Sequence, residues 1–318
     1  MALVSTGAIF LQNSRCTMGL IDLKKDYDYF TSIWEESGTN KKVHTSKAWD
    51  ERAKDWGKEL NKKEDFQVNM DQRVQATAKF LRSHGLLGEG SQVLDIGCGP
   101  GRFVTEFAKT SGYVTGIDLS EKMIQLGQKH AEECGIKNVS FMAGDFLKLN
   151  VEALGWEKKF DLVFAAITPA LGTMESLEKS MRICKGFCFH ACNIRWLDDL
   201  ESKIKKEILG KEEEPQKNSF GKWFYSLFNM LWIKGYFPMT DYYINEKEER
   251  IKVDKDLAQY YAKTFSRDLE RSDELVIEIL EYLQKIADSE GFVTRRCERW
   301  QGWILWDVRK CIPRLLDI

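Results

Sequence analysis

The chain has 318 residues, of which 43% are hydrophobic and 12% aromatic, enough to bury a full core as one elaborated domain or two small ones. The formal charge of −2 gives no electrostatic reason to expect a nucleic-acid partner, because phosphate binding favours a basic face. Eight cysteines at irregular spacings in a chain of this size predict reduced thiols, and hence a cytoplasmic protein.

The N-terminal part is expected to be a leader followed by a helical cap. The apolar run within Met1 to Cys16 has no basic segment before it and is too brief for a signal peptide or a membrane span. Residues 1–20 are therefore predicted to be a loose leader without stable membrane insertion, and residues 21–88 the cap. Within the cap, residues 46–60 predict a helix with Ser46 as N-cap, and residues 70–85 predict a second that ends at Gly85.

From Ser91 the pattern alternates between apolar strands and amphipathic helices. Strands are predicted at 91–97, 113–119, 138–145, 159–167 and 187–193, and helices at 102–112, 120–135 and 173–186. Strands that alternate with helices form right-handed crossovers and a mostly parallel sheet covered on both faces. The alternation therefore predicts an open α/β sheet.

The alternation stops after Arg195. Residues 196–290 are predicted to be a helical insertion that serves as a lid or substrate subdomain. Residues 291–310 return to strand, and their two halves flank Gln301 and Gly302 as in a hairpin. The expected fold is α/β, a doubly wound, mostly parallel sheet of seven strands with an antiparallel C-terminal hairpin, in which residues 89–195 and 291–318 form the core.

A glycine-rich turn, VLDIGCGPGR, follows the first predicted strand at Val93 to Arg102. Glycines let the backbone approach a ligand closely where the strands end, which points to a nucleotide-like molecule. The dinucleotide fingerprint G-x-G-x-x-G needs glycine where Arg102 stands, and Pro100 removes an amide that could bind phosphate. A nicotinamide-dependent oxidoreductase is therefore disfavoured.

VLDIGCGPG resembles motif I of the class I methyltransferases that use S-adenosylmethionine, and the match continues in order through GIDLS, AGDF and FDLVFAA. The resemblance covers roughly Ser91 to Asn193 together with the terminal strands. Several motifs at matching spacing are a stronger signal than a lone glycine loop. The resemblance implies a Rossmann-like core, methyltransferase activity and S-adenosylmethionine as the cofactor.

The resemblance also implies which residues hold that cofactor. Asp95 would face the methionine part, where a carboxylate can hold the ammonium group. Asp118 would accept hydrogen bonds from the ribose hydroxyls, and Asp145 from the exocyclic amine of adenine. The other implied contacts are the backbone of Gly97, Gly99 and Gly101 beside the methionine part, Leu119, Met123 and Phe146 around the adenine, and Ala165 and Ile167 on the path to the methyl group.

The residues around the acceptor are less distinctive. Methyltransferases of nucleic-acid bases often carry Asn/Asp-Pro-Pro-aromatic at the place of the segment 167–170, ITPA, so base methylation is disfavoured. Trp49, Arg52 and His190 are the candidates for a base or an orienting group. AWDERAKDW resembles a segment that folds over the cofactor in many small-molecule methyltransferases, with ordinary helix packing as the alternative.

His190 shares a strand face with two cysteines, Cys188 and Cys192. Thiolate and imidazole bind soft metals, but neighbours on one strand do not converge to tetrahedral geometry. Buried thiols also pack as small hydrophobes. We therefore expect plain core packing and no metal.

The block from Phe220 to Met239 has aromatic residues all around its predicted helix. It can be a substrate lid, a membrane-interface helix, a dimer surface or plain core. The predicted function is transfer of a methyl group from S-adenosylmethionine to a small molecule, apolar or aromatic in part, by in-line displacement in a monomer or homodimer. The alternatives are a protein or RNA methyltransferase and a non-catalytic protein that binds S-adenosylmethionine.

Overall fold

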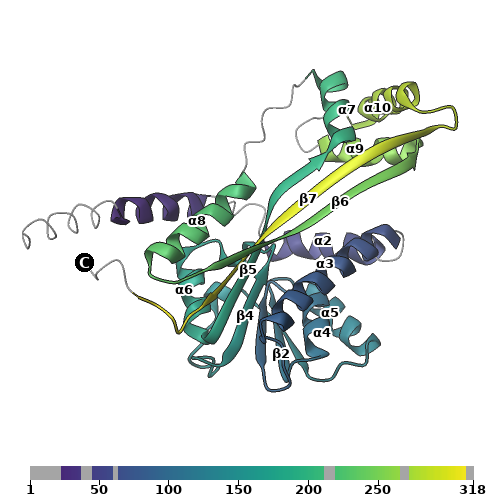
Figure 1. The fold of residues 1–318 in the computed structure, drawn as a ribbon. Helices are drawn as coiled ribbons and strands as arrows, with labels where there is room; N and C mark the ends of the chain where they lie inside the picture. The colour runs from purple at the N-terminus through teal and green to yellow at the C-terminus, as the bar shows by residue number, and fades with distance from the viewer. Residues whose placement is uncertain (1–22, 37–44, 60–63, 211–218, 266–271, 313–318) are drawn as a thin grey trace, which may run out of the picture. The chain divides into compact units, whose positions relative to one another are not determined.

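The computed structural model describes residues 23–36, 45–59, 64–210, 219–265 and 272–312. They contain a sheet of seven strands in the order β3-β2-β1-β4-β5-β7-β6, with β7 antiparallel (Figure 1). Strand β1 pairs in parallel with β2 and β4, β2 with β3, and β4 with β5. The predicted fold class is confirmed.

The strands are β1 (Gln92–Ile96), β2 (Tyr113–Asp118), β3 (Val139–Ala143), β4 (Phe160–Ala166), β5 (Cys184–Asp198), β6 (Met239–Lys252) and β7 (Phe292–Asp307). A helix at residues 23–36 precedes α2 (Ser46–Glu59), α3 (Glu64–Ser83), α4 (Arg102–Ala108), α5 (Glu121–Glu133) and α6 (Met174–Ile183). Then follow α7 (Asp199–Leu209), α8 (Ser219–Ile233), α9 (Lys255–Phe265) and α10 (Ser272–Ile286). Two 3-10 turns are η1 (Phe146–Lys148) and η2 (Pro169–Leu171).

Side chains at the helix ends explain several of these boundaries. Ser120 caps the N-terminus of α5 through its hydroxyl, and Gly135 follows the helix with a φ of 68°. At α2 the predicted N-cap, Ser46, is wrong. Thr45 Oγ1 accepts a hydrogen bond from Ala48 N at 3.2 Å, and Ser46 is the first helical residue.

Helices cover both faces of the sheet, because both faces of its parallel strands are apolar (Figure 1). Helices α3, α4 and α5 pack on one face, with Val74, Phe107 and Phe189 in a shared core. The helix at 23–36, α6 and α8 belong to the core on the other face, which contains Trp34 and Cys188. Cys188 and Phe189 therefore lie on opposite faces of β5, as the strand pattern predicts.

The chain divides into two compact units. The first comprises Met1–Cys192, Gly221–Tyr243 and Gly302–Ile318, and the second Asn193–Phe220 and Ile244–Gln301. The second unit has its own core, to which α7, α9 and α10 contribute. The predicted leader, residues 1–20, lies outside the described residues. The predicted boundaries of cap, core and insertion stay a prediction.

Two local predictions are wrong. The segment 196–290, predicted to be helical, contains the strand β6, and its side chains alternate in exposure as a strand requires. The hairpin predicted at Gln301 and Gly302 is one uninterrupted strand, β7, which lies between β5 and β6. Gly302 instead allows the Phe224 side chain to pack closely against β7, because a Cβ on residue 302 would lie 2.3 Å from Phe224 Cδ2.

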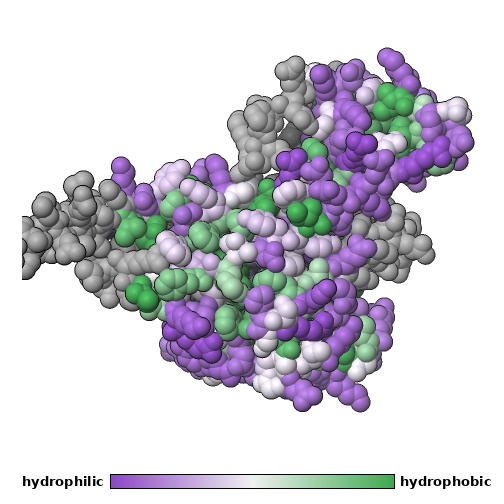
Figure 2. Space-filling view, in the orientation of Figure 1, coloured by the Kyte–Doolittle hydropathy of each residue, from purple (hydrophilic) through white to green (hydrophobic). Residues whose placement is uncertain are grey.

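The aromatic block around α8 is partly core and partly surface. Leu227 and Met230 are buried, whereas Tyr225 is 55% and Trp232 42% exposed. Hydrophobic residues also reach the surface near α8 in Figure 2. The inner side of α8 is therefore core, and a lid, membrane or dimer role for its outer side stays a prediction.

Candidate active site

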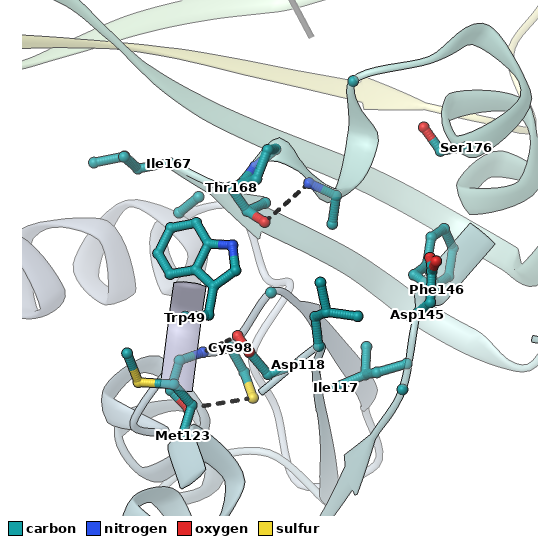
Figure 3. Close-up of a pocket in the computed structure, with 18 of the residues that line it drawn as sticks. Trp49, Cys98, Ile117, Asp118, Met123, Asp145, Phe146, Ile167, Thr168 and Ser176 are labelled. Carbon is teal, nitrogen blue, oxygen red and sulfur yellow. Dashed lines mark hydrogen bonds between the residues drawn. The ribbon is translucent and has the colours of Figure 1, made fainter. Parts of the chain in front are cut away.

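A cavity of about 380 Å³ lies at the carboxyl ends of β1, β2 and β4 (Figure 3). Its wall is built from the glycine loop after β1, the end of β2, the turn after β3 and the segment after β4, with Trp49 of α2. Ligands of open α/β sheets bind at this edge. The volume also lies in the range of small-molecule and cofactor sites.

The glycine loop takes backbone conformations that other residues avoid. Gly97, Gly99 and Gly101 have φ values of 72°, 52° and 71°. A Cβ on Gly97 would lie 2.1 Å from Thr168 Oγ1, whereas one on Gly99 would meet no atom within 4 Å. Gly97 is therefore fixed by packing against the segment after β4, and Gly99 leaves space beside the loop.

Asp118 ends β2 and lines the cavity. Its Oδ2 accepts a hydrogen bond from Gly99 N and its Oδ1 one from Ser120 N, both at 2.9 Å. Each carboxylate oxygen can accept a further bond, so two hydroxyl donors can still be bound. Burial is the main cause that raises the pKa of Asp118 above its ordinary value.

Helix α2 is joined to this acid through Ser120. The buried Ser120 hydroxyl donates to Asp50 Oδ1 at 2.5 Å, and the charge of Asp50 also raises the pKa of Asp118. The same helix supplies Trp49 to the cavity wall, with Arg52 Cζ 4.4 Å from the centroid of its ring. Trp49 thus lies at the cavity, whereas Arg52 does not line it and lies over the indole ring of Trp49.

Asp95 and Arg73 are an acid and a base whose charges interact beside the glycine loop. Asp95 is buried in β1, and its Oδ2 has no hydrogen-bond partner among the described residues. Burial raises the pKa of Asp95 well above its ordinary value, the charge of Asp118 adds to this, and Arg73 opposes it. Arg73 lines the cavity, and Asp95 lies behind the lining. Such a pair suits the ammonium and carboxylate of an amino acid.

Arg73 was missed by the sequence analysis. It belongs to α3, an amphipathic helix, where an arginine is expected on the solvated face. Its guanidinium instead lies over the ring of Phe103, with Cζ 5.4 Å from the centroid. Only this packing, which the sequence does not show, reveals that Arg73 faces the cavity.

The residues predicted around the adenine come together at the cavity. Leu119, Met123, Asp145 and Phe146 all line it. Asp145 Oδ1 accepts a hydrogen bond from Leu147 N at 3.0 Å as the cap of η1. The carboxylate is thus oriented by the turn that also carries Phe146.

Three further predicted residues do not line the cavity. Gly101 is the last glycine of the loop and packs against Phe141, because a Cβ on Gly101 would lie 2.7 Å from the Phe141 ring. Ala165 is fully buried in β4 and pairs in register with His190 of β5. His190 is itself buried, and burial lowers its pKa to about 4.

Strand β4 ends in a strained residue that lines the cavity. Ile167 has a φ of 52°, a conformation that β-branched residues rarely adopt. Its amide donates to Ala191 O at 2.8 Å, and Thr168 Oγ1 then accepts from Ala170 N at 3.2 Å (Figure 3). These bonds hold the chain in a turn that carries residues 166–170 along the cavity. Backbone strain of this kind is concentrated at functional sites.

A comparison with protein families decides what this arrangement is. A family described as a methyltransferase domain matches residues 87–269, more than half of the chain. The chain belongs to the class I S-adenosylmethionine-dependent methyltransferases. The predicted cofactor, S-adenosylmethionine, is thereby confirmed.

Individual relatives of this methyltransferase differ in what their names say they act on. A ubiquinone biosynthesis O-methyltransferase of Albidiferax ferrireducens is 38% identical over 76 residues, which cover 23% of this chain and 28% of that one. The EEF1A lysine methyltransferase 2 of Homo sapiens is 30% identical over 155 residues, covering 45% and 64%. The chain thus matches less than two thirds of the length of either relative. The magnesium protoporphyrin IX methyltransferase of Synechocystis, solved with bound S-adenosylhomocysteine, is 16% identical, with a TM-score of 0.41 and coverage of 76% and 84%.

Three general features bear on the methyltransferase's surroundings. Among the described residues, no helix is both long and apolar enough to cross a bilayer. Within the same ranges, no three His, Cys, Asp or Glu side chains gather as metal ligands would. The cysteines that the structure describes, from Cys98 to Cys311, are free thiols.

We expect the affinity for S-adenosylhomocysteine to fall as the pH is lowered. The pKa values of Asp95 and Asp118 are both raised, and each carboxyl would attract the ammonium or the hydroxyl groups predicted beside it best when ionised. As the pH falls through the raised values, the carboxyls take up protons and their attraction for the ammonium and hydroxyl groups is lost. Calorimetric titrations between about pH 8 and about pH 5 check this. Asp95→Asn should flatten the slope, and an affinity independent of pH in the unsubstituted protein would contradict the expectation.

Proposed function

We propose that the protein transfers a methyl group from S-adenosylmethionine to a small molecule that is apolar or aromatic in part. One observation carries the cofactor half of this proposal. Asp118, whose oxygens each accept one main-chain hydrogen bond and retain further lone pairs, stands at the cavity beside the open Gly99. That is the combination that a ribose with two hydroxyls and a flat base beside it requires.

The other contacts follow from this placement of the ribose. Leu119, Met123 and Phe146 pack on the adenine, and Asp145 accepts a bond from its amine. At the other end, Arg73 holds the carboxylate of the methionine part, whose ammonium lies toward the loop of Gly97, Gly99 and Gly101 and is attracted by Asp95. The methyl group then lies near the strained turn at Ile167.

The reaction is an in-line displacement. A lone pair of the acceptor attacks the methyl carbon, the carbon–sulfur bond breaks, and its electron pair stays on sulfur, so the leaving group needs no proton. Holding the three atoms in line supplies about 7–11 kcal/mol of the barrier. Trp49, whose ring lies at the cavity and carries Arg52 on its face, covers the sulfonium, because aromatic faces attract cations.

The acceptor is assigned to small molecules from the chain's own features. A formal charge of −2 gives no electrostatic reason to expect RNA as the acceptor, and the turn at residues 167–170 lacks the groups that hold the amine of a base. The free thiols suit a cytoplasmic enzyme. Protein methylation is the second candidate, favoured by the match over 155 residues to the EEF1A lysine methyltransferase 2.

Methyl-labelled S-adenosylmethionine tests the proposal. The protein is incubated separately with pooled small phenols, thiols and amines, with lysate proteins and with RNA. Label in the small-molecule fraction supports the proposal, and label only in protein or RNA overturns it. Binding of S-adenosylhomocysteine without any transfer would identify a non-catalytic binding protein.

Arg73→Met is expected to weaken S-adenosylhomocysteine binding at least tenfold. A charge-assisted hydrogen bond of the guanidinium to a carboxylate contributes about 1.5–3 kcal/mol. The affinity for 5′-methylthioadenosine, which has no amino-acid part, should not change. Arg82→Met on the same helix is the matched control, because Arg82 pairs with Glu106 at 2.6 Å and does not line the cavity. Equal losses for both nucleosides would show that Arg73 only supports the fold.

A further inference from the structure

The turn after β3 carries the residues proposed to recognise the adenine, and the sheet supports this turn on one side only. Among the described strands, β3 lies at the edge of the sheet and pairs with β2. On that side Gly144 N donates a hydrogen bond to Asp118 O at 2.8 Å. The chain then leaves the sheet through Asp145 and η1, and the Phe146 ring packs in the core to which α6 contributes. Any further support for the main chain of the turn has to come from the side away from β2.

Lys179 of α6 supplies that support. Its Nζ donates hydrogen bonds to Leu147 O and to Leu149 O, each at 2.6 Å. These carbonyls lie at the C-terminal end of η1, where the last carbonyls of a helix have no partner within the helix and a cation is favourable. The same Nζ lies 5.5 Å from the centroid of the Phe146 ring. One side chain thus contacts both the backbone and the aromatic ring of the turn.

The ammonium of Lys179 is partly withdrawn from water. Burial is the largest cause that lowers its pKa, and the charges of Glu175 and Asp145 oppose this effect. Lys179 and Asp145 therefore interact electrostatically across the turn. Hydrogen bonds from a charged donor are stronger than those between neutral groups, so the two bonds to the carbonyls hold the turn firmly.

Leu147 connects Lys179 to the acid that faces the ligand. The amide of Leu147 donates to Asp145 Oδ1 at 3.0 Å, and its carbonyl accepts from Lys179. Asp145, Phe146 and Leu147 all line the cavity, and Figure 3 shows Asp145 and Phe146 together at one side of it. A displacement of Leu147 would therefore turn the Asp145 carboxylate away from its present direction.

We propose that Lys179 is a positioning residue that makes the cavity selective for a purine with an amino group at position 6. The inference rests on the proposed function, in which Asp145 accepts a hydrogen bond from the adenine amine. Lys179 does not line the cavity and acts through Leu147. A carboxylate held in one direction accepts a bond from a 6-amino group, whereas a 6-oxo group presents a second acceptor to it and is disfavoured.

The test compares two ligands that differ only at position 6 of the purine. S-inosylhomocysteine carries an oxygen there, whereas S-adenosylhomocysteine carries the amino group. By calorimetry we expect the unsubstituted protein to bind S-adenosylhomocysteine at least tenfold more tightly, because a site built to hydrogen-bond an N–H group rejects analogues that lack it. The ratio of the two dissociation constants is called the purine ratio.

Lys179→Met keeps the apolar stem of the side chain and removes the ammonium. The purine ratio should fall at least threefold, because the Asp145 carboxylate is no longer held in one direction. Lys179→Arg keeps the donors and should leave the purine ratio within twofold of its original value. A folded Lys179→Met protein with an unchanged purine ratio would overturn the proposal, even if both ligands bind more weakly, because Lys179 would then only support the fold.

Two further variants keep the test decisive. Lys179→Gln, whose amide can reach only one of the two carbonyls, should lower the purine ratio at least twofold and replaces Lys179→Met if that protein does not fold. Lys185→Met is the matched control, because Lys185 pairs with Asp161 at 3.2 Å and does not line the cavity. Its purine ratio should equal that of the unsubstituted protein. An equal fall in Lys185→Met and in the Lys179 variants would contradict the assignment.

A double substitution tests whether Lys179 acts through Asp145. Asp145→Ala should bring the purine ratio close to one, and adding Lys179→Met should then lower it no further, since residues that act as a unit are not additive. A fall of the same size in both backgrounds would show that Lys179 acts by another route and would overturn the proposal.

The titration with S-adenosylhomocysteine keeps this inference apart from the proposed function. If the protein binds this nucleoside and transfers labelled methyl groups while the purine ratio does not depend on Lys179, only the role of Lys179 is wrong. If S-adenosylhomocysteine itself fails to bind, the proposed function is wrong as well.

Discussion

Gly97→Ala is expected to abolish binding of S-adenosylhomocysteine and to lower the free energy of unfolding by about 2–5 kcal/mol. At a φ of 72° a side chain strains the backbone, and the new Cβ would lie 2.1 Å from Thr168 Oγ1 and 2.7 Å from Thr168 Cβ. The segment after β4 must therefore move. Both loops line the cavity, so the displacement reaches the cofactor. Denaturant unfolding and calorimetry measure the two effects.

Gly99→Ala is the matched control for stability. Its φ of 52° imposes a similar backbone strain, but its Cβ would meet no atom within 4 Å. We expect it to cost only about 1–2 kcal/mol. Adding Thr168→Gly to Gly97→Ala should restore the part of the loss that comes from crowding. Equal destabilisation by the two alanines would show that Thr168 does not constrain Gly97.

Asp118→Ala is expected to weaken S-adenosylhomocysteine binding at least about a hundredfold. Two hydrogen bonds from ribose hydroxyls to a charged group are lost, each contributing about 1.5–3 kcal/mol. The main-chain amides of Gly99 and Ser120 lose their acceptor as well, which loosens the loop. Calorimetry of the purified variant measures the loss of affinity.

Asp161→Ala separates the ligand effect from the loss of a structural carboxylate. Asp161 Oδ2 accepts a main-chain hydrogen bond from Gln92 N at 2.9 Å, at the end of β1 and β4 far along the strands from the cavity. This variant should bind S-adenosylhomocysteine as the unsubstituted protein does. The ribose placement is wrong if Asp118→Ala loses no more affinity than Asp161→Ala.

The part of the fold that carries the cofactor site is predictable because its signals are local. Runs rich in apolar residues predict β1, β2 and β4 as strands that are buried on both faces, and glycines and acids mark where β1 and β2 end. Asp118 and Asp145 are found at one edge of the sheet for the same reason. The loop glycines have positive φ values, which other residues rarely adopt.

The strand β6 could not be predicted from the sequence, because it carries charged residues that form ion pairs and lacks the alternation of apolar and polar residues that marks a strand. Glu249 pairs with Arg295 at 2.5 Å and Glu248 with Arg296 at 2.6 Å, so both faces of β6 carry charge at neighbouring positions. A period-2 hydrophobic pattern is then absent. The strained turn at Ile167 could not be predicted from the sequence either. Only tertiary packing imposes a φ of 52° on a β-branched residue.

Ser120 connects the proposed ribose-binding acid, Asp118, to helix α2. Its amide donates a hydrogen bond to Asp118, and its hydroxyl donates one to Asp50. A change in the position of one acid therefore affects the hydrogen bond to the other. Coupling between two binding events is reciprocal. We expect a donor molecule that binds to Asp118 also to stabilise the position of α2, because Ser120 hydrogen-bonds both Asp118 and Asp50.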